Sequence, residues 1–320
     1  MNPFETFIKE ELKSEFVKIN VDNNNRQGHG HVLSVKIVMP CYCQANCPFC
    51  FNKLTKSTQV HDFYAFIEEC EKSLDLIFST ITNRKITLDI TGNEPTFNIQ
   101  QFAYFMGFLS YYKRNFPDQI DKIVLTTNSY HLKEVYKIMY NVVDILNISV
   151  HHPDYRVRTD EIFRTSLILN NNSLQEIIND LQSNGISVTA VAVIDKVHDD
   201  IEQFVYDFAE FGNMTGFKDV RIRFDYTTTD ENIRKQFYAP FKNWCIDLDE
   251  QQGLATKRLL INDYRVNLYL GVPDLVDHVV GVEAVIDDDG KLYLDYNKRY
   301  PLNKGLLKPM SKYIYALKKA

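Results

Sequence analysis

The sequence predicts an α/β protein whose core is a partial (β/α)6 barrel. Segments typical of strands and of helices alternate across residues 32–226. Such alternation gives a parallel sheet with right-handed crossovers, which curve it. The chain has 320 residues, 45% of them hydrophobic, which is enough to bury the core of one such domain. We therefore expect an N-terminal helix and loop (1–31), the barrel (32–226) and a C-terminal α+β extension on the substrate side (227–320).

The core strands are predicted from runs rich in β-branched residues. The first such run, Val32–Met39, is ended by Pro40. Ser173 is predicted as the N-cap of a helix with an apolar face, and Gly185 as its end. The other strands are expected at 85–90, 122–126, 145–150, 186–194 and 220–224, and the other helices at about 62–78, 102–116, 132–140 and 201–211.

The two flanks are predicted to differ from the core. Apolar residues at roughly helical spacing predict a helix within residues 1–20, followed by a polar loop. Residues 257–296 are predicted to form antiparallel strands, including a hairpin at 284–294 with an Asp-Gly turn. A basic helix is expected near residues 312–319.

Composition argues against two classes of partner. The net charge is −6, from 36 basic and 42 acidic side chains, so no overall field favours nucleic acid or an anionic membrane surface. No apolar run approaches the length of a membrane span, and no leader sequence is evident. We expect a cytoplasmic protein.

Four of the six cysteines lie within the ten residues 41–50, just after the first predicted strand and Pro40. Three of them, Cys43, Cys47 and Cys50, have the spacing C-x3-C-x2-C, which suits three irons of an iron–sulfur cubane and leaves the fourth iron open. Two alternatives are a structural zinc site and a disulfide. Zinc knuckles normally have two distant C-x2-C pairs, and a reducing compartment disfavours a disulfide.

This loop, with Phe49 just before its last cysteine, resembles the signature of the radical SAM enzymes. The resemblance implies that Cys43, Cys47 and Cys50 hold one [4Fe-4S] cluster, that S-adenosylmethionine (SAM) binds its fourth iron and that Phe49 contacts SAM. It leaves the role of Cys41 open. It covers roughly residues 32–226.

The turn after the second predicted strand resembles the family's Gly-Gly-Glu-Pro turn, which holds the amino group of SAM. Here it consists of Gly92, Asn93, Glu94 and Pro95, so Asn93 replaces the second glycine. Asparagine tolerates unusual backbone angles better than most residues, so the turn remains plausible. An ordinary βα turn is the alternative.

Later strand ends carry further polar residues. By resemblance, Thr127, Asn128 and Ser149 are expected to contact SAM, although Thr, Asn and Ser are also common in caps and turns. Arg221 and Arg223 share one face of the sixth strand, where such a pair can bind a carboxylate or phosphate of SAM or of the substrate. Arg223 is the expected SAM contact, with a surface ion pair as the alternative. Cys245 is a candidate hydrogen-atom donor, with burial in the core as its alternative.

The resemblance implies reductive cleavage of SAM to a 5′-deoxyadenosyl radical that abstracts hydrogen from a substrate. A nucleotide or small metabolite is favoured over a peptide, and the reductant is expected to be a flavodoxin or ferredoxin. The alternatives are a peptide-modifying enzyme of the same family and a non-catalytic, zinc-stabilised binding protein.

Overall fold

The computed structural model describes residues 16–20, 32–50, 62–82, 84–194, 200–224, 247–248, 256–269, 276–280, 283–293, 301–304, 307 and 313–318. All structural statements below concern these residues.

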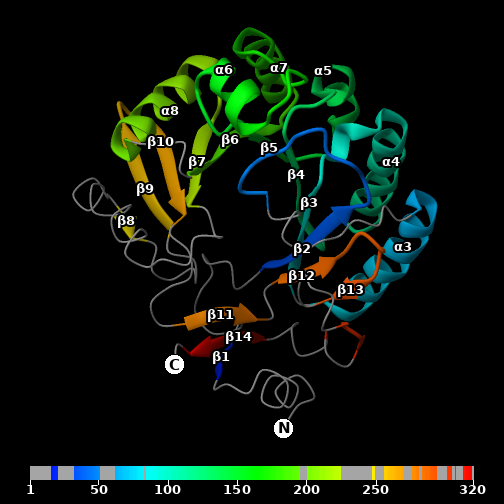
Figure 1. Cartoon of the computed structure of the whole chain (residues 1–320). Coiled ribbons are helices and arrows are strands. Elements are labelled where there is room, and N and C mark those ends of the chain that lie inside the picture. The colour runs from blue at the N-terminus through cyan, green and yellow to red at the C-terminus, as the bar shows by residue number, and fades with distance from the viewer. Residues whose placement is uncertain are drawn as a thin grey trace.

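A curved sheet forms the centre of the molecule (Figure 1). Its six core strands stand side by side in chain order and are all parallel. The predicted fold is confirmed, since each core strand follows its neighbour through a crossover. These strands are β2 (Val32–Met39), β3 (Lys85–Gly92), β4 (Ile120–Thr127), β5 (Ile145–Ser149), β6 (Ser187–Ile194) and β7 (Asp219–Phe224).

Helices cover the outer face of this sheet (Figure 1). In β2, Leu33, Val35 and Ile37 are fully buried in the core that the strands share with the helices, and they alternate with the less buried Ser34 and Lys36. The helical elements are α3 (Phe63–Thr80), the 3₁₀ turn η2 (Pro95–Phe97), α4 (Ile99–Asn115), α5 (Leu132–Val135) with the 3₁₀ turn η3 (Tyr136–Met139), α6 (Tyr155–Val157), the π-helical turn η4 (Arg158–Ile162), α7 (Asn171–Ser183) and α8 (Ile201–Thr215).

The opposite face of the sheet is polar. Lys36 of β2 and Asp89 of β3 are paired in register and form an ion pair of 2.8 Å. Asn147 and Thr189, on β5 and β6, continue this face and are buried. Successive side chains of a strand point to opposite faces, so the curved sheet has an apolar side toward the helices and a polar concave side.

Strands from beyond the barrel extend both edges of the sheet. β12 (Glu283–Ile286) pairs parallel with β2, and β13 (Leu292–Tyr293) forms the predicted hairpin with it. At the other edge β10 (Tyr264–Tyr269) pairs parallel with β7, and β9 (Thr256–Ile261) pairs antiparallel with β10. The antiparallel pairs were predicted; the parallel attachment of β10 and β12 to the barrel was not. β8 (Asp247–Leu248) ends the row beside β9.

Two terminal predictions were wrong. Residues Phe16–Asn20 form a strand, β1, where a helix was expected, and Tyr313–Lys318 form a strand, β14, in place of the basic helix. These strands pair antiparallel with each other, and β14 also pairs with β11 (Val276–Val280). Pairing between distant segments overrides a short helical pattern, because each short strand gains its stability from its neighbour.

The N-cap of α7 was also misplaced. The cap is Asn170, whose side chain accepts a hydrogen bond from the backbone N–H of Ser173 at 2.9 Å. The helix therefore begins two residues earlier than Ser173, because asparagine is as good a cap as serine. Its predicted end is confirmed, since the N–H of Gly185 bonds to the Gln182 carbonyl with φ at +83°.

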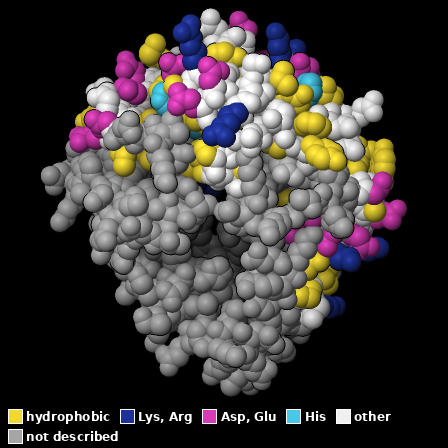
Figure 2. Space-filling view, in the orientation of Figure 1, with side chains coloured by type: hydrophobic (Ala, Val, Ile, Leu, Met, Phe, Trp, Pro, Cys, Tyr) yellow, Lys and Arg dark blue, Asp and Glu magenta, His cyan; other side chains and the backbone are white. Residues whose placement is uncertain are grey.

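The described surface agrees with the composition. Acidic and basic side chains are interspersed over the described part of the face in Figure 2 and form no continuous basic area there. Among the described helices, none is long and apolar enough to cross a membrane.

Candidate active site

The cysteine loop begins where β2 ends, at the carboxyl edge of the sheet. Its backbone is attached to the segment after β5, because the N–H of Asn46 donates to the Phe163 carbonyl at 2.8 Å. The Phe49 ring packs edge-on against the His151 ring, with 4.8 Å between centroids. His151 is itself held by Val193, whose N–H donates to Nδ1 at 3.1 Å. The loop is thus packed against the segment that follows β5, and Val193 of β6 holds His151 in place.

The cysteines of this loop have different surroundings. Cys41 is buried, its thiol donates to the Met39 carbonyl at 3.5 Å, and burial raises its pKa well above the ordinary value. Cys43 is exposed as a residue, but its Sγ faces the protein, and desolvation raises the pKa of its thiol to about 11. Cys47 and Cys50 are partly exposed, and the N–H of Cys50 donates to the Cys47 carbonyl at 3.4 Å.

The donor set fits an iron–sulfur cluster. Three thiols share one short loop at an accessible edge of the sheet, and the sulfur of Cys43 receives an amide N–H, as cluster sulfurs commonly do. A thiol with a raised pKa becomes a thiolate only with compensation, which a metal supplies. Among the described residues, no three His, Cys, Asp or Glu side chains converge on a site for a single metal ion.

The turn after β3 is tied directly to the cysteine loop. Asn93 Nδ2 donates to the Cys41 carbonyl at 2.5 Å, and the N–H of Glu94 donates to the Tyr42 carbonyl at 3.2 Å. The residue that departs from the family's glycine therefore makes a contact that glycine has no side chain to make. Gly92 has a φ of +111°, which side-chain-bearing residues rarely adopt.

Glu94 lies at the centre of a buried hydrogen-bond network. The residue is 1% exposed. Its Oε1 accepts from the N–H of Thr96 at 3.0 Å, the hydroxyl of Thr96 at 2.6 Å and the hydroxyl of Thr127 at 2.6 Å. Its Oε2 accepts from the N–H of Asn128 at 2.7 Å. Burial raises the pKa of Glu94, and these hydrogen bonds oppose that rise. The carboxylate holds the ends of β3 and β4 together.

Asn128 connects this network to the cysteine loop. Its Nδ2 donates to Cys43 Sγ at 3.4 Å, and its Oδ1 accepts from Gln44 Nε2 at 2.9 Å. Cys43, Asn93, Glu94, Thr127 and Asn128 thus meet at one edge of the sheet; their predicted roles as cluster ligand and SAM contacts stay predictions. Gln44 and Thr96 were missed, because a glutamine in a loop and a threonine after a turn carry no distinctive sequence signal.

The other predicted residues that the structure describes on later strands are not part of this network. Ser149 ends β5, and Arg223 lies near the end of β7, four strands from β3 in the sheet. Arg221 Nε is 4.0 Å from Asp219 Oδ1 on the same strand. Cys245 lies outside the described residues, so its role stays a prediction.

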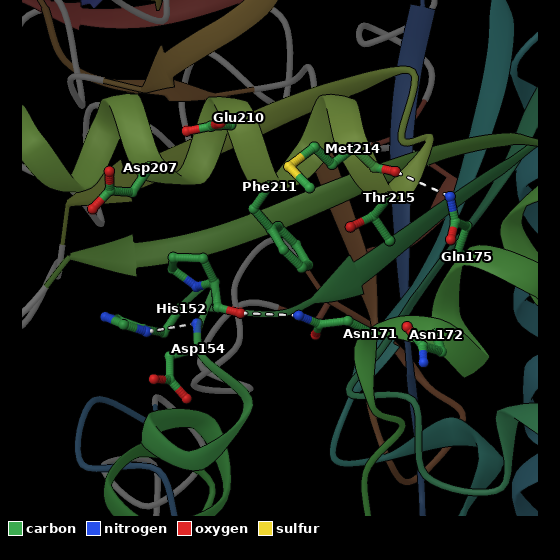
Figure 3. A pocket seen from close by; sticks show the side chains of 11 residues that line it. His152, Asp154, Asn171, Asn172, Gln175, Asp207, Glu210, Phe211, Met214 and Thr215 are labelled. Atoms are coloured by element: carbon green, nitrogen blue, oxygen red, sulfur yellow. Dashed lines mark hydrogen bonds between the residues drawn. The ribbon is translucent and has the colours of Figure 1, made fainter.

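A pocket of about 640 Å³ lies elsewhere, between α7, α8 and the segment after β5 (Figure 3). Asp207 and Glu210 enter it from α8, and Asn171 lies across from them, with its Nδ2 donating to the Pro153 carbonyl at 3.4 Å. None of the predicted site residues lines this pocket.

A curved parallel sheet with a three-thiol loop at its carboxyl edge defines an α/β barrel enzyme built to hold a metal cluster. The family model of the radical SAM superfamily matches residues 37–209, and the chain belongs to this superfamily. Membership confirms the predicted enzyme class and the predicted cofactors, a [4Fe-4S] cluster and SAM. It also sets aside the non-catalytic zinc-binding alternative. No curated protein matches the chain in sequence.

Solved structures show the same fold. The chain resembles anSMEcpe with bound AdoMet, at 15% identity and a TM-score of 0.57, covering 86% of this chain and 78% of that one. It resembles anSMEcpe with bound AdoMet and the Cp18Cys peptide at 14% identity and a TM-score of 0.58, covering 88% and 79%. Streptococcus suis SuiB bound to S-adenosylmethionine is 14% identical with a TM-score of 0.47; the match covers 67% of this chain and 45% of SuiB. At such identities the likeness to anSMEcpe concerns the fold alone.

Proposed function

We propose that Cys43, Cys47 and Cys50 ligate three irons of the [4Fe-4S] cluster and that SAM binds beside them, over the ends of β3 to β5. When bound, these cofactors supply a 5′-deoxyadenosyl radical that abstracts hydrogen from a substrate. The observation that carries the proposal is the hydrogen-bond network that joins the cysteine loop to Glu94 and Asn128.

The protein's own residues position and desolvate the reacting groups. Glu94 already accepts four hydrogen bonds from the protein, so we assign the ammonium group of SAM mainly to backbone carbonyls of the turn at 92–94. Thr127 and Ser149, at the ends of β4 and β5, are assigned to polar groups of SAM. Phe49, packed on His151, keeps the loop in place.

We propose a nucleotide or another small anionic metabolite as the substrate. Arg221 and Arg223 share the concave face of β7, and Lys36 lies on the same face of β2 in its ion pair with Asp89. Guanidinium groups bind phosphates and carboxylates with two parallel hydrogen bonds. A flavodoxin or ferredoxin would supply the electron, and a reducing cytoplasm would suit an oxygen-sensitive cluster. The fate of the substrate radical is not assigned.

The test is anaerobic cleavage of SAM. The protein is purified, reconstituted with iron and sulfide and reduced, and 5′-deoxyadenosine is measured by mass spectrometry. We expect brown protein that forms 5′-deoxyadenosine, and we expect Cys47→Ala to lose this activity. Cys70→Ala is the matched control, because Cys70 is fully buried on α3 outside the loop. Adding a nucleotide pool should increase the product several-fold.

Two results would contradict the proposal. Wild-type protein that takes up iron and still forms no 5′-deoxyadenosine would remove the assigned chemistry, and unchanged cleavage by Cys47→Ala would remove the assigned ligands. Stimulation by a peptide library and not by nucleotides would favour the peptide-modifying alternative.

A further inference from the structure

We propose that Asn128 is a positioning residue for the cluster itself, whose side-chain amide hydrogen-bonds a ligating sulfur and favours the reduced state. By resemblance, Asn128 was expected to contact SAM. In the structure its Nδ2 donates to Cys43 Sγ at 3.4 Å, and the residue is 8% exposed. The inference rests on the proposed function in one respect, since it takes Cys43 to be an iron ligand.

The direction of the amide is set by its other partners. Asn128 Oδ1 accepts from Gln44 Nε2 at 2.9 Å and from the N–H of Tyr130 at 3.1 Å. Both partners are donors here, so this end of the amide must be the oxygen and the opposite end, facing Cys43, must be the NH2 group. The contact with the sulfur is therefore a donated hydrogen bond.

The backbone of Asn128 is fixed as firmly as its side chain. Its N–H donates to Glu94 Oε2 at 2.7 Å, and Glu94 is held in turn by Thr96 and Thr127. The turn after β3 therefore determines where the amide of Asn128 lies relative to the loop after β2. Partners of this kind orient a metal ligand and tune the metal centre.

A hydrogen bond to a ligating sulfur changes the reduction equilibrium. Reduction adds one negative charge to the cluster, which is shared with its thiolates. An N–H donor stabilises that charge, so the hydrogen bond stabilises the reduced state more than the oxidised state. Removing the donor should make reduction harder.

The experiment is a potentiometric titration of the reconstituted protein without SAM, in which electron paramagnetic resonance monitors reduction of the cluster. The iron and sulfide content of each protein is measured as well. The variants are Asn128→Ala, which removes the donor, and Gln44→Ala, which removes one of the two groups that orient it together with the 3.9 Å contact between Cys43 Sγ and Gln44 Oε1. Asn172→Ala is the matched control, because Asn172 is exposed on α7. We expect Asn128→Ala to lower the equilibrium constant for reduction of the cluster by about tenfold, which for one electron is a downward shift of about 59 mV in the midpoint potential. Gln44→Ala should lower the midpoint potential by a smaller amount, and Asn172→Ala should leave the midpoint potential unchanged.

A wild-type midpoint potential in Asn128→Ala protein that carries a full cluster would overturn the inference. A change that appears only after SAM is added would also overturn it, because it would identify Asn128 as a SAM contact. If Asn128→Ala does not hold the cluster, Gln44→Ala decides, and a wild-type midpoint in that variant counts against the inference. Failure of the proposed function gives a different result: Cys43→Ala would keep a full cluster, or wild-type protein would not cleave SAM.

Discussion

Glu94 is a carboxylate whose surroundings are all donors. Three hydrogen bonds reach its Oε1 and one reaches its Oε2, from two threonines and the backbone of Asn128. An ionised carboxylate can accept all of them, since it has about four lone-pair sites. The residue therefore serves the fold as well as the site, because it joins the ends of β3 and β4, which the Thr96 hydroxyl also joins through the Tyr130 carbonyl.

Glu94→Gln should lower the free energy of unfolding by about 1–3 kcal/mol, because the new amide group turns an acceptor into a donor that faces other donors. Urea unfolding of the cluster-free protein measures this cost separately from catalysis. Glu69→Gln is the control: the Glu69 carboxylate forms a helical ion pair with the exposed Lys72 at 2.6 Å, and the loss of this pair should change stability by less than about 0.5 kcal/mol. Equal effects of the two substitutions would contradict the assigned role.

At this scale the sequence predicted residue types better than contacts. Cys43 was predicted from the spacing of the cysteines, and Glu94 and Asn128 from resemblance to family motifs at strand ends. The structure brings the three together, because parallel strands end at the same edge of a sheet. The contact between Asn128 and Cys43 Sγ joins residues 85 positions apart, and no local pattern encodes it. The same holds for Asn93, whose side chain was expected to be tolerated and was found bonded to the Cys41 carbonyl.

At the scale of elements, the loop and the turn that make the site depend on how β2 and β3 end. Met39 and Gly92 are paired in register at the last position of the two strands. A Cβ added to Gly92 would lie 2.8 Å from Val38 Cγ1, and the φ of +111° is unfavourable for any residue with a side chain. Gly92 thus allows the two strands to end together and the turn to reach the cysteine loop.

Gly92→Ala should destabilise the protein by about 1–3 kcal/mol, from backbone strain and from the displacement of Val38. Gly107→Ala provides an internal comparison of opposite sign. Gly107 lies within α4, and a Cβ there meets no atom within 4 Å. Alanine should stabilise that helix by about 0.5–1 kcal/mol. Thermal unfolding of both variants checks the pair, and a stabilising Gly92→Ala would show that the turn is not constrained as described.

The elements that the sequence predicted well are those with long periodic patterns. The six core strands and the long helices α3, α4, α7 and α8 were found because a buried face repeats along each of them. β1 and β14 were taken for helices because each is short and takes its structure from a partner about 300 residues away.

At the scale of the whole molecule, the barrel sheet is completed by the C-terminal third of the chain. β12 covers the free edge of β2, and β10 covers the free edge of β7. Val266 and Leu268 of β10, with Ala284 and Ile286 of β12, are fully buried in the same core as the barrel strands. The order of the core strands follows from the alternation of elements, but which later strands would close its edges does not, because edge pairing is set by tertiary contacts.

A chain ending at residue 226 should therefore aggregate, although it contains the whole matched barrel region. It would expose the backbone donors and acceptors of two long parallel strands, together with the apolar surface that β10 and β12 cover, and such edges pair readily with other chains. A chain ending at residue 311 is the matched comparison: it loses β14, which pairs with β1 and β11 and leaves the central sheet complete. Size-exclusion chromatography with light scattering should show aggregates for the first and a single discrete species for the second. A discrete, cluster-binding product of the first truncation would show that the barrel strands do not need their C-terminal partners.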